Sequence, residues 1–186
     1  MTAASVAIDW YAARAGGVVA YLLLSCAVVL GLVLAGKEQL PGWPRFALEE
    51  VHRFAGLVVG VFVVLHVSMI AVDSQARFSL AELVVPLTSS YRPFWTGIGI
   101  VAAELLLALG LANRYRKRIS YRVWRRLHYL NFLVWIAATA HGLGSGTDRS
   151  SAWLLGICLS AIGAVGALTV RRALRPQRPT TAPANS

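Results

Sequence analysis

Charged residues are scarce in this sequence, and cysteines are scarcer still. Of 186 residues, 14% are Asp, Glu, Lys or Arg and 57% are hydrophobic, and the mean hydropathy is +0.62. Soluble domains carry about 25% charged residues, so this composition excludes an ordinary soluble enzyme and predicts an integral membrane protein. The two cysteines, Cys26 and Cys158, lie in apolar stretches without a C-x-x-C-H motif or a cluster of ligands. This excludes covalently attached haem and sites for iron–sulfur or zinc built on thiolates.

Five apolar runs are long enough to cross a hydrocarbon core about 30 Å thick. They predict an all-α fold, a bundle of five transmembrane helices within one domain over residues 1–175. The first run is too long for the apolar part of a signal peptide, so we expect an uncleaved helix. The expected helices cover about 16–36, 44–72, 93–113, 120–143 and 151–171.

Helix starts and connections follow from local residue types. Prolines at 44 and 93 and serines at 120 and 150 or 151 mark the expected helix starts. Residues 79–90 are too short to span a membrane and contain Pro86, so we expect an interfacial segment on the outer face. The proline-rich, polar tail 176–186 is predicted to be disordered.

The net charge of +10 orients the chain rather than indicating nucleic acid. Fourteen basic residues fall at the first and third connections and after the last helix, against four elsewhere (Arg14, Arg77, Arg92, Arg149). By the positive-inside rule the N-terminus is outside and the C-terminus cytoplasmic, in a multi-pass protein of the cytoplasmic membrane. The second and fourth helices then run parallel to each other.

All four histidines of the chain lie in two matching apolar segments. Residues 52–66 read HRFAGLVVGVFVVLH and residues 128–141 read HYLNFLVWIAATAH, so each segment begins and ends with histidine. A lone membrane histidine is often a packing residue whose ring bonds to a carbonyl or a water. Two matched pairs on parallel helices instead indicate a functional site, because ionisable side chains at membrane depth are costly and imidazole is a preferred ligand of haem iron.

The spacing of the histidines predicts two separate sites. At about 1.5 Å per residue, His52 and His66 are about 21 Å apart along their helix, and His128 and His141 about 19.5 Å apart. Parallel helices place His52 level with His128 and His66 level with His141. Two facing imidazoles suit a haem between them better than zinc, which takes four protein ligands in structural sites. With both axial positions filled, such an iron is suited to passing electrons rather than to activating oxygen.

A helical wheel of about 100° per residue supports the first helix of this arrangement better than the second. His66 falls within about 40° of His52, and the face between them carries small residues that leave room for a macrocycle (Ala55, Gly56, Val59, Val63). Gly56 and Gly60 equally fit a G-x-x-x-G helix contact. His141 falls about 140° from His128, so its helix must contain a tightened turn, a bend or a compensating rotamer.

The two spacings resemble those of a known membrane family. H-x13-H on one helix and H-x12-H two helices later is the pattern of the ferric reductase-like transmembrane domain. The family includes the membrane parts of NADPH oxidases and ferric reductases, and the haem subunit of the bacterial periplasmic methionine sulfoxide reductase system. Three further stretches look like small bacterial members: DWYAARAGGVVAYLLL (9–24), LTSSYRPFWTGIGI (87–100) and YRVWRRLHYLNFLVW (121–135). The resemblance covers roughly residues 9–145.

The resemblance implies two b-type haems, an inner one on His52 and His128 and an outer one on His66 and His141, carrying electrons outward. Family members typically continue into a flavin- and nicotinamide-binding domain, but no G-x-G-x-x-G follows a strand here. We therefore expect an oxidoreductase component whose donor is a separate flavoprotein or a membrane quinol. Its acceptor would be ferric iron, oxygen or a redox partner on the periplasmic or extracellular side.

Residues near the histidines are candidates for contacts with the haems. Anionic propionates prefer Arg, Tyr or backbone donors; the candidates are Arg53, Arg125 and Arg126 on the inner side and Tyr91 and Arg92 on the outer side. The inner three equally fit positive-inside signalling. Trp135 lies halfway between His128 and His141, where it either assists tunnelling between the haems or simply packs.

Two other functions are compatible with the same residues. The chain could be a membrane anchor or assembly subunit of a redox complex with no turnover of its own. It could also be a transporter that uses the histidines and Glu104 as a proton relay. Glu104, near the middle of the third predicted span, would otherwise be a quinone site or a protonated residue bonded to a neighbouring helix.

Overall fold

The computed structural model describes residues 3–36, 40–74 and 77–174, with side chains described from residue 8 onward. Within these ranges the fold is helical and contains no strand. The elements are α1 (Ala3–Ala35), α2 (Arg45–Val72), α3 (Leu80–Val84), α4 (Pro93–Arg114), the 3-10 turn η1 (Arg116–Arg118), α5 (Tyr121–Tyr129), α6 (Asn131–Ser145) and α7 (Ala152–Ala173). The tail predicted to be disordered, 176–186, lies outside the described residues.

The helix starts lie where the local residue types predict them. Pro44 caps α2, and Pro93 is the first residue of α4. Ser120 caps α5, accepting a hydrogen bond from the backbone N–H of Val123, and Ser151 precedes α7. The first helix begins earlier than the apolar run of 16–36 suggested, because the alanine-rich residues before the run continue the same helix.

Four of the helices are long and apolar enough to cross a membrane: Ile8–Ala35, Arg45–Val72, Pro93–Arg114 and Ala152–Ala173. The single helix expected over 120–143 is instead two helices, α5 and α6, separated at Leu130. The backbone N–H of Leu130 donates to the Leu127 carbonyl at 2.9 Å, a tightened turn. The side-chain amide of Asn131 donates to the carbonyl of His128 at 2.8 Å, which replaces a backbone partner at the break.

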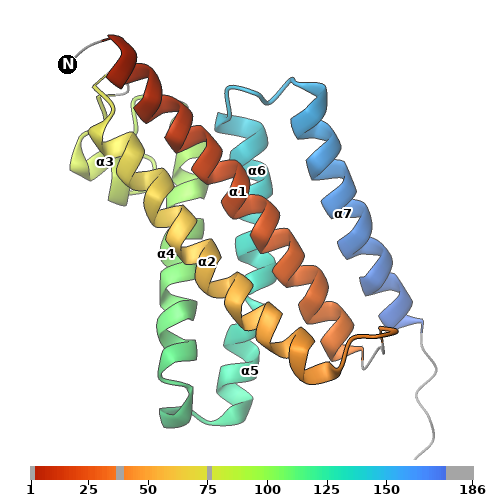
Figure 1. Ribbon diagram of the computed structural model, residues 1–186. Helices are drawn as coiled ribbons and strands as arrows, with labels where there is room; N and C mark the ends of the chain where they lie inside the picture. Colours follow the sequence, from red (N-terminus) through yellow and green to blue (C-terminus); the bar gives the residue numbers. More distant parts are fainter. Residues whose placement is uncertain (1–2, 37–39, 75–76, 175–186) are drawn as a thin grey trace, which may run out of the picture.

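Helix α1 is the central element of the bundle. It packs along α2 and also contacts α6 and α7, while α4 packs on α6 (Figure 1). Of its most apolar stretch 44% is buried within the protein, against 11–17% in the other three long helices. In Figure 1, α2 runs in the same direction as α5 and α6, as the charge distribution predicts.

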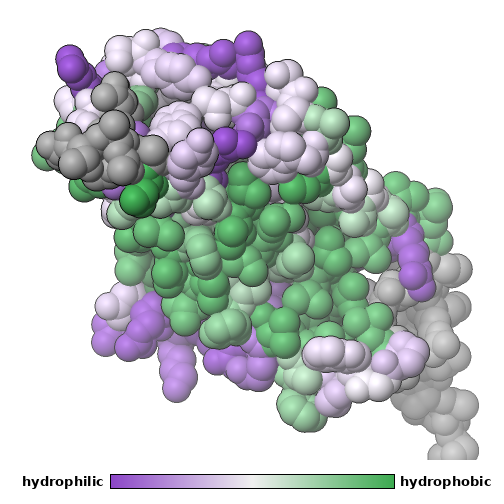
Figure 2. All heavy atoms as spheres, turned by 45° about the horizontal axis from the view of Figure 1, so that its top comes forward, coloured by the Kyte–Doolittle hydropathy of each residue, from purple (hydrophilic) through white to green (hydrophobic). Residues whose placement is uncertain are grey.

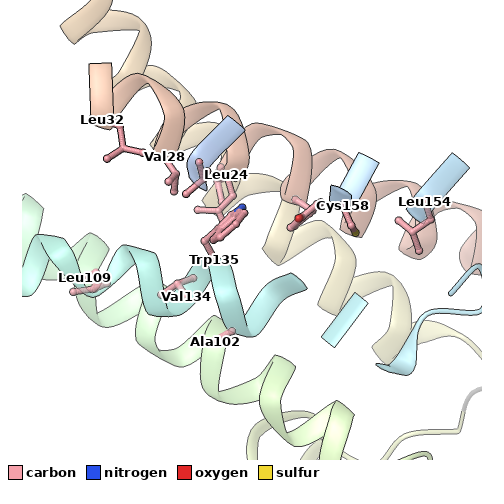
Figure 3. Close-up of a cluster of buried hydrophobic side chains, with 12 residues drawn as sticks. Leu24, Val28, Leu32, Ala102, Leu109, Val134, Trp135, Leu154 and Cys158 are labelled. Atoms are coloured by element: carbon pink, nitrogen blue, oxygen red, sulfur yellow. The ribbon is translucent and has the colours of Figure 1, made fainter. Parts of the chain in front are cut away.

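The core lies between α1, α4, α6 and α7, with Val59 added from α2. Figure 3 shows Trp135 of α6 beside Leu24 and Val28 of α1, with Cys158 of α7 nearby. On the outer surface, large apolar side chains are exposed, whereas a soluble protein buries most of them. Large apolar side chains are exposed along α2 (Phe54, Leu57, Val61, Val64, Leu65), and Figure 2 shows a hydrophobic belt between two hydrophilic rims. This is a membrane protein, and the belt is the surface that lipid covers.

The two ends of the bundle differ in charge. We name them the α5 end, where α2 and α5 begin and α1, α4 and α7 finish, and the α3 end, where α1 begins (Figure 1). Lys37, Arg175 and Arg178 lie outside the described residues. The α3 end carries Arg14, Arg77, Arg92 and Arg149, and the α5 end carries Arg45, Arg53, Arg114, Arg116, Lys117, Arg118, Arg122, Arg125, Arg126, Arg171 and Arg172.

Candidate functional site

The structure brings the four histidines together in two pairs. The ring centroids of His52 and His128 are 5.9 Å apart, and those of His66 and His141 are 6.4 Å apart. In both pairs the ring planes are close to perpendicular, at 71° and 78°. Each pair joins α2 to the α5–α6 segment. The first lies toward the α5 end and the second toward the α3 end, about 21 Å further along α2.

The donor set and its spacing fit a haem. Bonds from imidazole nitrogen to a first-row metal are about 2.0–2.1 Å long, so two rings that ligate one iron from opposite sides have centroids about 6.4 Å apart. The second pair has this separation, at 6.4 Å, and the first pair is 0.5 Å shorter, at 5.9 Å. Among the described residues, no group of three or more His, Cys, Asp or Glu side chains could hold a metal ion. A bare zinc site would need more protein ligands than two imidazoles, whereas a haem brings its own four in-plane nitrogens.

Backbone carbonyls of α1 set the tautomer of the two α2 histidines. The Nδ1 of His52 lies 2.9 Å from the carbonyl oxygen of Ala27, and the Nδ1 of His66 lies 2.6 Å from that of Ala13. A carbonyl oxygen can only accept, so Nδ1–H is the donor and Nε2 carries the free lone pair. A metal-ligating histidine is usually oriented by such a bond from its other ring nitrogen.

His141 is held in the same way by α4. Its Nδ1–H donates to the carbonyl oxygen of Trp95 at 3.0 Å. His128 is held differently, because its ring stacks on the indole of Trp124 with centroids 5.3 Å apart and planes 22° apart. Trp124 in turn lies 5.8 Å from the exposed ring of Tyr121 at the start of α5.

Glycines lie against three of the four imidazoles. A Cβ at Gly31 would come within 3.3 Å of His52 Cε1, and one at Gly17 within 3.0 Å of His66 Nδ1. A Cβ at Gly99 would overlap the ring of His141. Side chains at these positions would push the rings out of their present places.

The break between α5 and α6 turns His141 part of the way toward the side of His128. A tightened turn advances the chain by about 120° per residue rather than 100°, which turns the later residues toward the face of the earlier ones. The turn follows His128 directly, at Leu130. The expectation of a tightened turn or bend in this segment is therefore confirmed.

Trp135 lies in the core, where it joins a buried hydrogen-bonded chain. Its Nε1–H donates to Ser25 Oγ at 3.0 Å, and Thr139 Oγ1 donates to the Trp135 carbonyl at 2.9 Å. Thr139 also bonds to the Tyr21 hydroxyl at 3.1 Å. The chain links α1 to α6 halfway between the two histidine pairs. It gives Trp135 the packing role that the sequence offered as one of two readings, together with a hydrogen bond that the sequence did not reveal.

The basic candidates beside the first pair contact neighbours on their own helices. Arg53 pairs with Glu50 at 2.8 Å, and the Arg125 guanidinium lies 3.4 Å from the Tyr129 hydroxyl. Arg126 is exposed on α5. All three lie at the α5 end, at the level where α2 enters the bundle. In the described part of the chain the polar contacts of Arg53 and Arg125 are thus with Glu50 and Tyr129 rather than with the rings of the first pair.

The candidates beside the second pair are docked on the end of α6. Arg92 Nη1 donates to the Gly144 carbonyl at 2.5 Å, and the Tyr91 hydroxyl donates to the Ser145 carbonyl at 3.1 Å. The guanidinium of Arg92 also lies over the Tyr91 ring, 5.5 Å from its centroid. Arg92 adopts a left-handed backbone with φ of 44°. Both side chains are thus placed one turn beyond His141.

Part of the small-residue face between His52 and His66 packs inside the bundle rather than facing open space. Ala55 and Val59 are buried, and Val59 belongs to the core cluster with α1 residues. A Cβ at Gly56 would meet no atom within 4 Å.

Glu104 is exposed on α4, five residues and about 140° around the helix from Gly99. It therefore faces away from the second pair.

Comparison with known proteins points to one family. The family model described as "Ferric reductase like transmembrane component" matches residues 16–139, two thirds of the chain. The matched segment contains His52, His66 and His128 and ends two residues before His141. A search of curated proteins and a search of solved structures each find no significant match.

Proposed function

The chain belongs to the ferric reductase-like transmembrane family, and from this membership we propose that it carries electrons across the cytoplasmic membrane through two b-type haems. Domains of this family generally bind haem, and the family suggests transmembrane electron transfer. The single observation that supports the proposal most strongly is the separation of the histidine rings, 5.9 Å and 6.4 Å in the two pairs. Each haem would supply a one-electron Fe(III)/Fe(II) couple with no open coordination position.

Each histidine pair would bind one of the two haems. His52 and His128 would hold the inner haem and His66 and His141 the outer one. Three of these imidazoles donate Nδ1–H to a backbone carbonyl, which leaves Nε2 unprotonated and aimed away from the carbonyl. These three proposed iron ligands are therefore fixed in tautomer and direction before any cofactor arrives, which limits the reorganisation that accompanies each electron.

The polar residues at the two ends of the bundle are consistent with this electron-transfer path. Arg53, Arg125 and Arg126 at the α5 end and Tyr91 and Arg92 at the α3 end are placed to offer donors to anionic propionates. The excess of basic residues at the α5 end supports a cytoplasmic position for that end by the positive-inside rule. Joined end to end, α5 and α6 would form the fifth span, with the N-terminus outside and the C-terminus cytoplasmic.

Electrons would enter at the α5 end from a separate flavoprotein or a membrane quinol and leave at the α3 end to an acceptor outside the cytoplasm. A proton relay through the histidines and Glu104 is less favoured, because Glu104 lies on the face of α4 turned away from His141. A purely structural anchor is less favoured as well. It would not need two imidazole pairs at the spacing of a shared metal.

Vesicles test this function directly. The purified protein is reconstituted into liposomes that hold ferricyanide inside, and dithionite is added outside. We expect the trapped ferricyanide to be reduced far faster than in empty vesicles, and His52→Ala and His66→Ala each to abolish the difference. A haem-loaded protein that reduces trapped ferricyanide no faster than empty vesicles would contradict transmembrane electron transfer.

A further inference from the structure

Three of the four imidazoles are held by the same local device, which we call a carbonyl–glycine notch. It consists of the backbone carbonyl of one helical residue and a glycine four residues later. Ala13 and Gly17 form the notch for His66, and Ala27 and Gly31 form the notch for His52, both on α1. On α4, Trp95 and Gly99 form the notch for His141.

Helix geometry explains why the glycine stands four residues after the carbonyl. The carbonyl of a residue points along the helix toward the N–H four residues on, and Cα–Cβ bonds tilt back toward the N-terminus. A Cβ at that later position therefore projects over the carbonyl and blocks approach from the side. Glycine leaves the carbonyl open to a second donor from a neighbouring helix, here an imidazole Nδ1–H.

The two notches of α1 repeat with the spacing of the histidines they hold. Gly17 and Gly31 are 14 residues apart, as are His66 and His52. Fourteen residues make about 21 Å and return within about 40° to the same face of a helix. Because α1 and α2 run antiparallel (Figure 1), one straight face of α1 meets both histidines of α2.

We infer that α1, which carries no histidine, is the element that positions one imidazole of each pair, and that Gly17 and Gly31 are its positioning residues. This inference rests on the proposed haem-binding function. The notch sets which ring nitrogen is free and which way the ring plane faces. It thereby contributes to the near-perpendicular crossing of the planes, 71° in the first pair and 78° in the second.

A neighbouring glycine separates this role from simple close packing of helices. A Cβ at Gly16 would meet the His66 backbone N at 3.4 Å and Cα at 3.5 Å, which are ordinary contacts. A Cβ at Gly17 would meet ring atoms Nδ1 at 3.0 Å and Cε1 at 3.1 Å. If α1 needed small residues only to approach the α2 backbone, Gly16→Ala would cost at least as much as Gly17→Ala, because its Cβ is the one that would meet that backbone.

The experiment compares Gly17→Ala and Gly31→Ala with Gly16→Ala in the full-length protein. Electron paramagnetic resonance of the oxidised protein reports the angle between axial imidazole planes, because perpendicular planes give a more anisotropic low-spin signal than parallel ones. Haem release to excess apomyoglobin reports affinity. We expect Gly17→Ala to shift the signal of one haem and to weaken its retention by about 10–100-fold.

The other two variants have different expected results. Gly31→Ala should act on the other haem and more mildly, because its Cβ would meet only His52 Cε1 closely, at 3.3 Å. Gly16→Ala should match the wild type in both readouts. A larger residue in Gly31→Val should deepen the effect of Gly31→Ala on the same haem.

The outcomes that overturn the inference are distinct from failure of the proposed function. If the wild-type protein binds no haem, the proposed function fails and the inference with it. If the wild type binds haem while Gly17→Ala and Gly31→Ala retain its signals and retention, the inference alone is wrong. Equal losses in Gly16→Ala and Gly17→Ala would also overturn it, because they would show a general packing effect of α1.

Discussion

Replacing Gly99 with alanine extends the test from α1 to α4, and its size follows from the structure. A Cβ at this position would meet Cε1 of the His141 ring at 2.6 Å and Cγ at 2.7 Å. Ordinary Cβ contacts begin at 3.4 Å, and Nδ1 lies nearer still than these two atoms, so the ring must withdraw by roughly 1 Å. The bond from Nδ1–H to the Trp95 carbonyl, now 3.0 Å long, would then exceed the limit of a hydrogen bond.

Loss of such a supporting bond weakens metal binding by about 10–100-fold, which corresponds to about 1.4–2.7 kcal/mol. Haem content per chain, measured by the pyridine haemochrome assay after dilution, should fall from about two to about one. Gly110→Ala is the matched control on the same helix, because a Cβ there would meet no atom within 4 Å. A Gly99→Ala protein that keeps both haems with unchanged retention would refute the role given to this contact.

Three further predictions concern the rest of the chain. Ser25→Ala leaves the buried Trp135 Nε1–H without its acceptor, so it should destabilise the protein by about 1–3 kcal/mol and lower the thermal midpoint in detergent, whereas Ser25→Thr should not. Asp148→Asn breaks the ion pair with Arg14, a partly exposed pair, so the midpoint should change by less than the equivalent of about 1 kcal/mol. The backbone N–H groups of Ser79 and Ser90 lower the pKa of Glu82 to about 2 from an ordinary 4.5. The cap of α3 is therefore fully stabilised above pH 4.5 and loses that contribution as pH falls toward 2; an NMR titration of the Glu82 carboxyl with a midpoint near 4.5 would contradict this.

The pairing of the histidines follows from the sequence because it depends on quantities that sequence carries. Spacing along each helix and the sidedness of basic residues place His52 beside His128 and His66 beside His141. The structure shows the same two juxtapositions. The helix starts at Pro44, Pro93 and Ser120 were predictable for a similar reason, since capping depends on one or two local residues.

The supports of the histidines did not follow from the sequence, for two physical reasons. The hydrogen-bond acceptors are the backbone carbonyls of Ala13, Ala27 and Trp95. Every residue has a backbone carbonyl, so the residue type does not identify these acceptors in the sequence. Glycine is also common in membrane helices, so Gly17 and Gly31 do not stand out by type. A signal was present in their spacing, because the two repeat at the same 14-residue interval as the α2 histidines.

The sequence indicated a distortion between His128 and His141 but did not show at which residue it lies. The wheel showed that thirteen residues cannot return His141 to the His128 face on an ideal helix. Several local distortions would solve that problem equally well, and no proline marks the place. The tightened turn at Leu130 is accompanied by a hydrogen bond from the Asn131 amide to the His128 carbonyl. A side chain that can replace a backbone partner is visible only once the fold is known.

The absorbance spectrum of the purified protein before and after dithionite tests the proposed function most directly. The two histidine pairs predict reduced bands of b-type haem and about two haems per chain, falling to about one in His66→Ala or His141→Ala. A colourless protein that cannot be reconstituted with haem, or single histidine variants that lose both haems or neither, would contradict the assignment.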